Sequence, residues 1–370
     1  MKKTLAAILV TTMAVSLLAG CGSGNKSGGA DTAPAAETKT EAAATEAQAE
    51  AAADTQAEAG QPAGEVIHMK LAHYAAVDHP GGVAAQAFAD AVKERTGGGI
   101  EIEVYPNNEL GAPDEMLEQN IMGVVDMTLG TQGSLDKYSK KFATVMMPFV
   151  FDSYEHAYKV LDGPFYEWTK DDLEDQGLHY VGSWDYGFRC LTNSKRPVNA
   201  PDDVKGLKIR TPGEIQLKSC MEALGAEVQQ IAFNELDLSL RQGVVDGQEN
   251  PLSVIYFNNM FETQKYLTVT NHVYNSMNLV ISKKVWDGLS PEYQTIIDEE
   301  SRNAALMMRD LIQNGDADYI AKLEEKGMEV TYPDTAEFAA KMEPSYKAIA
   351  EYAGSQEYID TFLKMVDECR

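Results

Sequence analysis

Cysteine, histidine and basic residues are all scarce in this chain of 370 residues. It contains 4 cysteines and 6 histidines, and its 31 lysines and arginines are outnumbered by 57 aspartates and glutamates, which gives a formal charge of −26. Nucleic acids and anionic lipid surfaces are bound by clustered lysine and arginine, so this charge argues against both as partners. A small anionic ligand stays compatible with it, because charges more than ~10 Å away are largely screened.

Catalytic and metal-binding motifs are also missing. We find no Walker phosphate loop, no dinucleotide glycine fingerprint, no HExxH motif and no nucleophile elbow. His68, His73 and His79 lie near one another in sequence, but their spacing fits no single helical face, and no CxxC pair or cysteine and histidine cluster indicates a metal or redox site. Acidic pairs such as Asp171 and Asp172 are most simply a solvated helix face. We therefore predict neither an enzyme nor a metal or other cofactor.

Long apolar runs are confined to the N-terminus. Lys2 and Lys3 precede a mostly apolar run from Leu5 to Leu18, which is shorter than the ~20 residues of a membrane-spanning helix. The pattern predicts an export signal peptide over residues 1–20. The run ends in Leu-Ala-Gly-Cys, which resembles the bacterial lipobox. We expect lipidation of Cys21 and an extracytoplasmic domain anchored by lipid to the cell membrane, either in a periplasm or on the outer face of the membrane of a Gram-positive cell.

Residues 21–64 contain no aromatic or branched aliphatic residue. They cannot bury a core, and we predict a flexible tether. Beyond the tether the chain holds Cys190, Cys220 and Cys369. An odd number leaves at least one cysteine unpaired or paired between chains, and a disulfide between Cys190 and Cys220 is left open.

The remaining residues are too many for one ordinary core and indicate two lobes. Hydrophobic periodicity predicts β-α-β-α-β at the start, which is typical of a mostly parallel sheet covered by helices on both faces. The predicted strands are 66–72, 100–105 and 124–129, with helices before the glycines at 97–99 and over 113–122.

The same order of elements restarts after Gly177. The predicted strands are 179–184, 188–192, 207–210 and 227–231, the predicted helices are 214–224 and 235–242, and the extended segments 266–273 and 275–282 are expected to cross between the lobes. A long helix is expected from Pro291 past Gln313, with two helices broken near Gly315 as the alternative. Lobe one is predicted as 66–187 plus about 276–315, and lobe two as 188–275 plus about 316–370.

Three short segments are more specific than this pattern. They are Asp-Tyr-Gly-Phe-Arg at 185–189, Gly-Leu-Lys-Ile-Arg at 206–210, and Gly-Val-Val-Asp-Gly-Gln-Glu-Asn-Pro at 243–251, supported by Tyr-Pro-Asn-Asn-Glu-Leu-Gly at 105–111. Their joint order and spacing resemble the DctP-type solute-binding proteins of tripartite ATP-independent periplasmic (TRAP) transporters.

The resemblance implies a fold and a set of partners. The fold is α/β and like that of periplasmic binding proteins: two α/β lobes with mostly parallel sheets, joined by crossing strands and a long helix, with the ligand cleft between them. The function would be an extracytoplasmic receptor that closes around a small-molecule carboxylate and delivers it to the small and large membrane subunits of a TRAP transporter. We expect a monomer. A ligand-sensing lipoprotein of the same fold is the alternative function.

The resemblance also implies the binding residues. Arg210 would be the principal clamp on the ligand carboxylate, with Arg189 and Asn250 as further polar contacts. A guanidinium offers a rigid fork of donors that fits a carboxylate, and Arg210 ends a predicted strand, where ligands of open α/β sheets gather. Without the family, Arg210 could equally be the structural partner of an acidic residue.

Apolar and first-lobe residues would complete the cleft. Phe233 and Trp184 are expected beside the ligand, with burial in the core as the alternative for each. The wall from the first lobe is predicted to include Tyr74, His73, Thr131 and Gln132, which lie at or near the ends of predicted strands.

Departures from the family pattern limit the ligand. Thr131 stands where sialic-acid receptors have an acidic residue, and Asp237 and Ser239 stand where the family commonly has Tyr and Ala. A nine-carbon sugar acid is therefore not expected. A hexuronate-like sugar acid and a C4-dicarboxylate both remain open.

Overall fold

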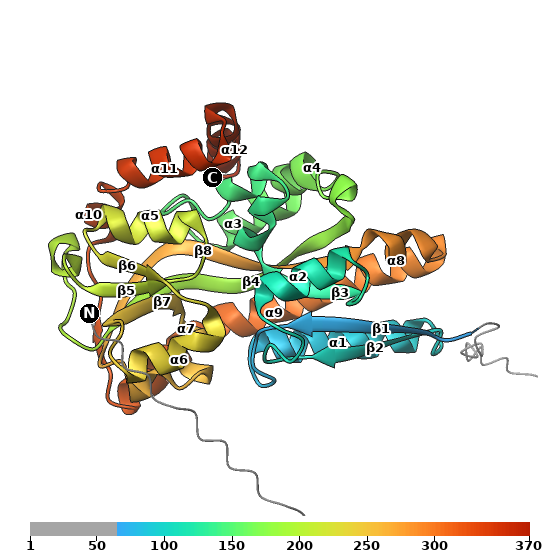
Figure 1. The fold of residues 1–370 in the computed structure, drawn as a ribbon, viewed down its shortest axis with the longest axis horizontal. Helices are drawn as coiled ribbons and strands as arrows, with labels where there is room; N and C mark the ends of the chain where they lie inside the picture. Colours follow the sequence, from blue (N-terminus) through green and yellow to red (C-terminus); the bar gives the residue numbers. More distant parts are fainter. Residues whose placement is uncertain (1–64) are drawn as a thin grey trace, which may run out of the picture. The chain divides into compact units, whose positions relative to one another are not determined.

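A computed structural model describes residues 65–370, so the predicted signal peptide, the lipidation site Cys21 and the tether lie outside the described residues. The described part contains one nine-stranded sheet (Figure 1). The strands are β1 (Ile67–His73), β2 (Ile100–Tyr105), β3 (Met127–Thr131), β4 (Leu178–Asn193), β5 (Lys208–Thr211), β6 (Glu227–Gln230), β7 (Gly247–Pro251), β8 (Tyr266–Ser282) and β9 (Glu329–Thr331).

The sheet consists of two parallel groups on either side of an antiparallel pair. The order is β2-β1-β3-β8-β4-β7-β5-β6, with β9 paired to β8. β1 is parallel to β2 and β3, and β5 is parallel to β6 and β7, whereas β8 and β4 are antiparallel to each other. Each parallel group with its crossover helices forms a lobe. β4 runs from the first lobe (β1–β3) to the second (β5–β7), and β8 runs back in the opposite direction. The predicted fold class is confirmed.

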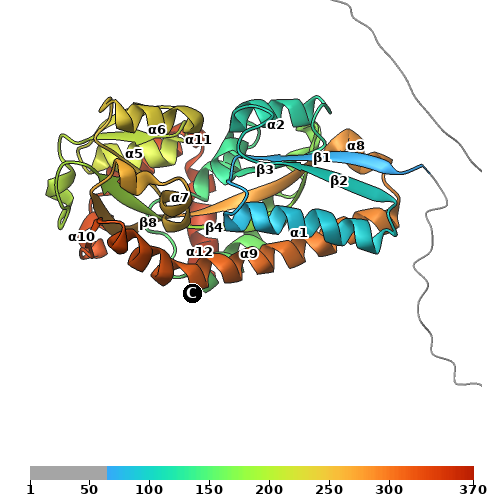
Figure 2. The same ribbon diagram turned by 90° about the horizontal axis from the view of Figure 1, so that it is seen from below.

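Helices cover both faces of this sheet (Figures 1 and 2). They are α1 (Pro80–Arg95), α2 (Pro113–Ile121), α3 (Tyr154–Val160), α4 (Tyr166–Thr169), α5 (Ile215–Ala223), α6 (Phe233–Arg241), α7 (Leu252–Phe257), α8 (Lys283–Gly288), α9 (Pro291–Glu325), α10 (Thr335–Ala339), α11 (Glu343–Ala353) and α12 (Gln356–Glu368). Between residues 65 and 370, none of these helices combines the length and the apolar character that crossing a bilayer requires.

The long helix α9 runs unbroken beside both lobes (Figure 2). It begins at Pro291, after Ser290 caps it with a side chain that accepts a hydrogen bond from the Tyr293 N–H. The expected long helix is therefore present, and the alternative of two helices broken near Gly315 is excluded. Tyr319, one turn later, packs its ring on Tyr256 of α7, and this tertiary contact outweighs the ~1 kcal/mol by which a glycine disfavours a helix.

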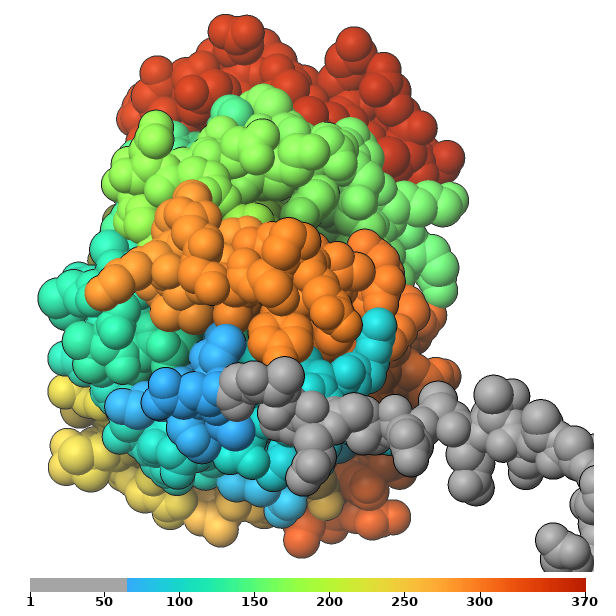
Figure 3. Space-filling view, turned by 90° about the vertical axis from the view of Figure 1, so that its right-hand side faces the viewer, coloured from blue at the N-terminus to red at the C-terminus, as the bar shows by residue number. Residues whose placement is uncertain are grey.

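An ion-pair cluster and a stacked pair of rings attach α8 and the start of α9 to the first lobe. Arg95 at the end of α1 pairs with Glu299 and Glu300 of α9 at 2.6 and 2.7 Å. His179 of β4 stacks on Trp286 of α8 with ring centroids 4.0 Å apart. In Figure 3 this orange segment accordingly lies between the blue start of the described chain and the green segment.

The two lobes repeat a short sequence at equivalent places. Gly-Val-Val-Asp occurs at 123–126, between α2 and β3, and again at 243–246, between α6 and β7. In each copy the aspartate accepts a hydrogen bond from the backbone of the central parallel strand: Lys70 N to Asp126 at 2.7 Å, and Lys208 N to Asp246 at 2.9 Å. The lobes therefore share topology and local chemistry.

Several predicted element boundaries are wrong. The predicted strands 179–184 and 188–192 form the single strand β4, and 266–273 and 275–282 form the single strand β8. The two strands stay paired through three irregular points. Two of these are β-bulges in β4, near Val181 and Tyr186, and at the third the extra residues, 269–272, lie in β8. β3 begins at Met127 instead of 124, because the preceding valines form the turn that the aspartate closes.

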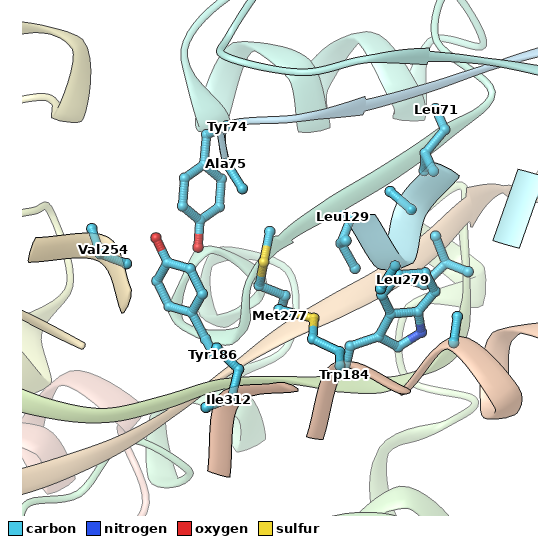
Figure 4. Packing of buried hydrophobic residues seen from close by; sticks show 14 of the residues in the cluster. Leu71, Tyr74, Ala75, Leu129, Trp184, Tyr186, Val254, Met277, Leu279 and Ile312 are labelled. Atoms are coloured by element: carbon cyan, nitrogen blue, oxygen red, sulfur yellow. The ribbon is translucent and has the colours of Figure 1, made fainter. Parts of the chain in front are cut away.

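The core next to the crossing strands is formed by both lobes and α9. Trp184 is fully buried there with Leu129, Met277 and Leu279 (Figure 4). Its indole nitrogen donates to Ser301 Oγ of α9 at 3.0 Å, so its one polar group is satisfied inside the core. This packing fixes β4 against α9.

Candidate ligand-binding site

A cavity of about 160 Å³ lies between the lobes, at the carboxyl ends of the parallel strands. Open α/β sheets bind ligands at this edge. The volume is below the ~300–1,000 Å³ of pockets for drug-sized ligands, so it favours a small solute. The lining residues that matter below are Tyr74, Thr131, Tyr186, Arg189, Arg210, Glu214, Phe233 and Asn250.

Neighbouring strands bring the three predicted polar residues together. Asn250 is on β7, next to Cys190 of β4 in the antiparallel register, so it is adjacent to Arg189. Arg210 is on β5, level with Gln248 of β7. All three side chains line the cavity, although their contact with a ligand stays a prediction.

Arg189 is held by a dense network behind the cavity. Its Nε and Nη2 donate to the Glu249 carboxylate at 2.5 and 3.0 Å, and Nη1 donates to Asn275 Oδ1 at 2.7 Å. Nη2 also donates to Asn250 Oδ1 at 3.1 Å. Burial opposes charge at Glu249, but Arg189 and His272 lower the pKa of this carboxyl. The charge of Arg189 is therefore balanced by Glu249, and its hydrogen bonds hold the side chain in one position.

Arg210 is a buried cation whose donors are largely unused. Its side chain is 1% exposed, Nε donates to the Ile231 carbonyl at 2.8 Å, and Nη2 has no hydrogen-bond partner within the described residues. Burial lowers the pKa of Arg210 to about 10, and repulsion by Arg189 acts in the same direction. Glu249, which attracts this cation, is already in a bidentate pair with Arg189. Arg210 thus offers N–H groups and a positive charge to the cavity.

Three aromatic rings form one wall. Tyr74 meets Tyr186 and Phe233 edge-on, with ring centroids 5.5 and 5.8 Å apart (Figure 4 labels the two tyrosines). Tyr186 and Arg189 both line the cavity although they are three residues apart on one strand. A β-bulge at Gly187 makes this possible, because it adds a residue to the alternation of β4. Gly187 has a φ of 105°, which favours glycine.

Three predicted site residues do not line the cavity. Trp184 is the core residue described above, where it packs on Phe88 of α1 and bonds to Ser301 of α9 away from the cavity. His73 is fully buried, neither of its ring nitrogens has a hydrogen-bond partner among residues 65–370, and burial lowers its pKa to about 4. Gln132 accepts a hydrogen bond from Ser276 Oγ at 2.5 Å inside the protein. By contrast, Tyr74 and Thr131 line the cavity as expected.

The structure adds a carboxylate that sequence reasoning missed. Glu214 follows β5, four residues after Arg210, and lines the cavity. Thr131 Oγ1 of the first lobe donates to Glu214 Oε1 at 2.9 Å. Burial raises the pKa of Glu214, while Arg189 opposes the rise. The one indication in the sequence that Glu214 could have a functional role was its position directly after a parallel strand.

Further polar residues lie at the same cavity. Asp136 accepts hydrogen bonds from Tyr352 Oη at 2.6 Å and from Gln216 Nε2 at 3.3 Å, and Lys137 pairs with Asp114 at 2.5 Å. No local pattern indicates that Tyr352, at the end of helix α11, reaches this site. Each of these charged groups already has a partner of opposite charge or a hydrogen-bond donor.

The described residues contain no group of three or more His, Cys, Asp or Glu side chains that could hold a metal ion. Cys190, Cys220 and Cys369 are all free thiols. The disulfide that the sequence left open between Cys190 and Cys220 is therefore not formed.

Known proteins match this chain in sequence and in structure. The DctP family model, described as bacterial extracellular solute-binding protein, family 7, matches residues 71–352. The 2,3-diketo-L-gulonate-binding periplasmic protein YiaO of Escherichia coli is 34% identical over 248 residues, which are 67% of this chain and 76% of that relative. The C4-dicarboxylate-binding periplasmic protein DctP of Rhodobacter capsulatus is 31% identical over 79% of this chain and 89% of its own length.

A solved structure shows the same fold. The sugar acid binding protein DctPAm of Advenella mimigardefordensis, in complex with galactonate, superposes with a TM-score of 0.79 at 29% identity and covers 83% of this chain and 100% of its own. The sequence and structure matches together show that the chain belongs to bacterial extracellular solute-binding protein family 7, the DctP-type solute-binding proteins of TRAP transporters.

Proposed function

We propose that this chain is an extracytoplasmic receptor that binds a small organic acid in the cavity between its lobes. One observation carries the proposal: Arg210 is a buried guanidinium at the cavity whose Nη2 has no hydrogen-bond partner in the described part of the chain. A ligand carboxylate would supply the missing acceptor and the compensating charge, and hydrogen bonds between charged groups are the strong ones. The family consists of solute-binding proteins of transporters, and the prediction that the chain is not an enzyme is confirmed.

The ligand class that we propose is a sugar acid or a C4-dicarboxylate. YiaO and DctPAm are named for sugar acids, and the relative from Rhodobacter is named for C4-dicarboxylates. Arg210 and Asn250 would hold the carboxylate, while Tyr74 and Phe233 would contact the carbon chain. Arg189 would hold Asn250 in place and present its remaining Nη1 hydrogen.

A thermal-shift screen tests this function. Galactonate, galacturonate and succinate represent the acids, and galactose is the neutral control with the same carbon skeleton as the first two. At about one hundred times its dissociation constant a ligand stabilises the folded protein by ~2.7 kcal/mol. We expect stabilisation by at least one of the acids and none by galactose. Stabilisation by the neutral sugar alone would contradict the role of Arg210.

We further propose that Cys21 carries a lipid anchor, that residues 21–64 are the tether, and that the receptor is a monomer which delivers its ligand to TRAP membrane subunits. The lipobox-like sequence and family membership support this. Cys21→Ser should move the protein from the membrane fraction to the soluble fraction with unchanged ligand affinity. Vesicles that contain the small and large subunits should accumulate labelled ligand only when the receptor is added.

The lobe boundaries stay a prediction as well. Residues 66–187 with about 276–315, and 188–275 with about 316–370, would move as two bodies when the ligand is released. The boundary at 187 and 188 falls on the bulge of β4 at Gly187, where a change of backbone angles disturbs few ladder hydrogen bonds.

A further inference from the structure

A carboxylate stands inside the anion-binding cavity. Glu214 precedes α5, but its side chain does not cap that helix. It turns to the first lobe, where Thr131 is its one side-chain hydrogen-bond partner among the described residues. It also lies directly over Gly133, where an added Cβ would be 2.3 Å from Glu214 Cγ. The position of Glu214 is therefore fixed by the loop that it faces.

Among the described charged residues that line the cavity, one cation, Arg210, and two anions, Glu214 and Asp136, have no partner of opposite charge, and Asp136 accepts hydrogen bonds from the uncharged Tyr352 and Gln216. Arg189 is in a bidentate pair with Glu249, and Lys137 is paired with Asp114 at 2.5 Å. Arg210 is then the cation left for a ligand. A ligand with one carboxylate neutralises it, whereas a second carboxylate finds no free cation and meets Glu214.

We propose that Glu214 determines the specificity of this cavity: it accepts a hydrogen bond from a ligand hydroxyl and excludes ligands with a second carboxylate. The inference rests on the proposed function, that the cavity binds an organic acid, and names its class. The ligand is a polyhydroxy monocarboxylate, such as an aldonate or a uronate, and not a C4-dicarboxylate. A like charge built into a site is a recognised means of rejecting the wrong ligand.

Galactonate and galactarate provide a matched pair of probes. They have the same carbon chain and the same inner hydroxyl groups, and differ in that galactarate ends in a second carboxylate where galactonate has a CH₂OH group. Isothermal titration calorimetry gives the two dissociation constants for the wild type. We expect galactonate to bind at least about tenfold more tightly than galactarate, which corresponds to ~1.4 kcal/mol, and succinate to bind more weakly than galactonate.

Glu214→Gln keeps the size and hydrogen-bonding capacity of the side chain and removes its charge. The ratio of the galactarate and galactonate constants should fall at least about tenfold, mainly because galactarate binds better. Glu214→Ser, which removes the carboxylate altogether, should lower the ratio in the same way. Glu222→Gln is the control, since Glu222 is a half-exposed glutamate on α5 that pairs with Lys218 away from the cavity, and it should leave the ratio unchanged.

The outcomes separate the two claims. If the wild type bound no acid at all, the proposed function would be wrong and the role of Glu214 would fall with it. If the wild type bound galactarate or succinate as tightly as galactonate, or if Glu214→Gln left the ratio unchanged, the cavity would still be an organic-acid site, but Glu214 would not set its specificity. Loss of cooperative folding in both Glu214 variants would show a structural role instead and would also overturn the inference.

Discussion

Replacement of Arg210 by methionine should make the unliganded protein more stable and nearly abolish binding. Burial lowers the pKa of Arg210 to about 10, well below the ordinary value of an arginine. Each pKa unit corresponds to ~1.4 kcal/mol, so the charged side chain destabilises the unliganded fold by on the order of 3 kcal/mol. This cost is present at every pH below the folded pKa and disappears only above the unfolded one, so it applies fully at pH 7.

Methionine keeps much of the side-chain length without the charge. The variant loses the hydrogen bond from Nε to the Ile231 carbonyl, which contributes ~1 kcal/mol. The net gain in the free energy of unfolding is then on the order of 1–2 kcal/mol, a rise in Tm of a few degrees. Binding should weaken at least ~30-fold, because truncating one partner of a buried charge pair costs ~2–5 kcal/mol.

Calorimetric melting of the unliganded protein and titration with galactonate measure both effects. Arg210→Lys should recover only part of the affinity, because an ammonium cannot replace the planar fork. Arg302→Met, at an exposed arginine of α9, is the control and should change neither quantity much. The reasoning is refuted if Arg210→Met binds within about threefold of the wild type, and Arg189 is then the next candidate. A large fall in the unliganded Tm would show that Arg210 is structural.

Three further predictions concern residues near the cavity other than Arg210. Glu249→Ala should lower the free energy of unfolding in urea by ~3–5 kcal/mol, because it leaves buried Arg189 without its anion; a loss below ~1 kcal/mol, typical of an exposed pair, would contradict this. Burial lowers the pKa of His73 to about 4 and of His79 to about 3, so the stability they contribute is present above the unfolded value of ~6.5 and is lost as pH falls. The free energies of unfolding from urea titrations at pH 7.5 and 5.0 should differ by ~2 kcal/mol for each histidine, and His73→Asn should remove about half of the summed difference. Gly187→Ala should lower Tm, since φ is 105° and the added Cβ would lie 3.2 Å from a methyl of Ile312, and an unchanged Tm would mean that the bulge can relax.

The element order and the three polar residues could be predicted from the sequence. Hydrophobic periodicity is a local property, and it indicated β-α-β units in both halves. Arg210 ends a parallel strand, and parallel strands present their carboxyl ends to one edge, so its place at the cavity followed from strand order. The family motifs added Arg189 and Asn250, which the register of β4 and β7 makes neighbours.

Only the tertiary structure decided which side chains reach the cavity. Trp184 and Tyr186 are two residues apart on β4 and belong to the same core cluster, but only Tyr186, which lies closer to the second lobe along the strand, reaches the cavity. Glu214 meets Thr131 across 83 positions of sequence. Such contacts come from the packing of one lobe on the other, and no periodicity within either segment encodes them, because the partner of each side chain belongs to a distant part of the chain.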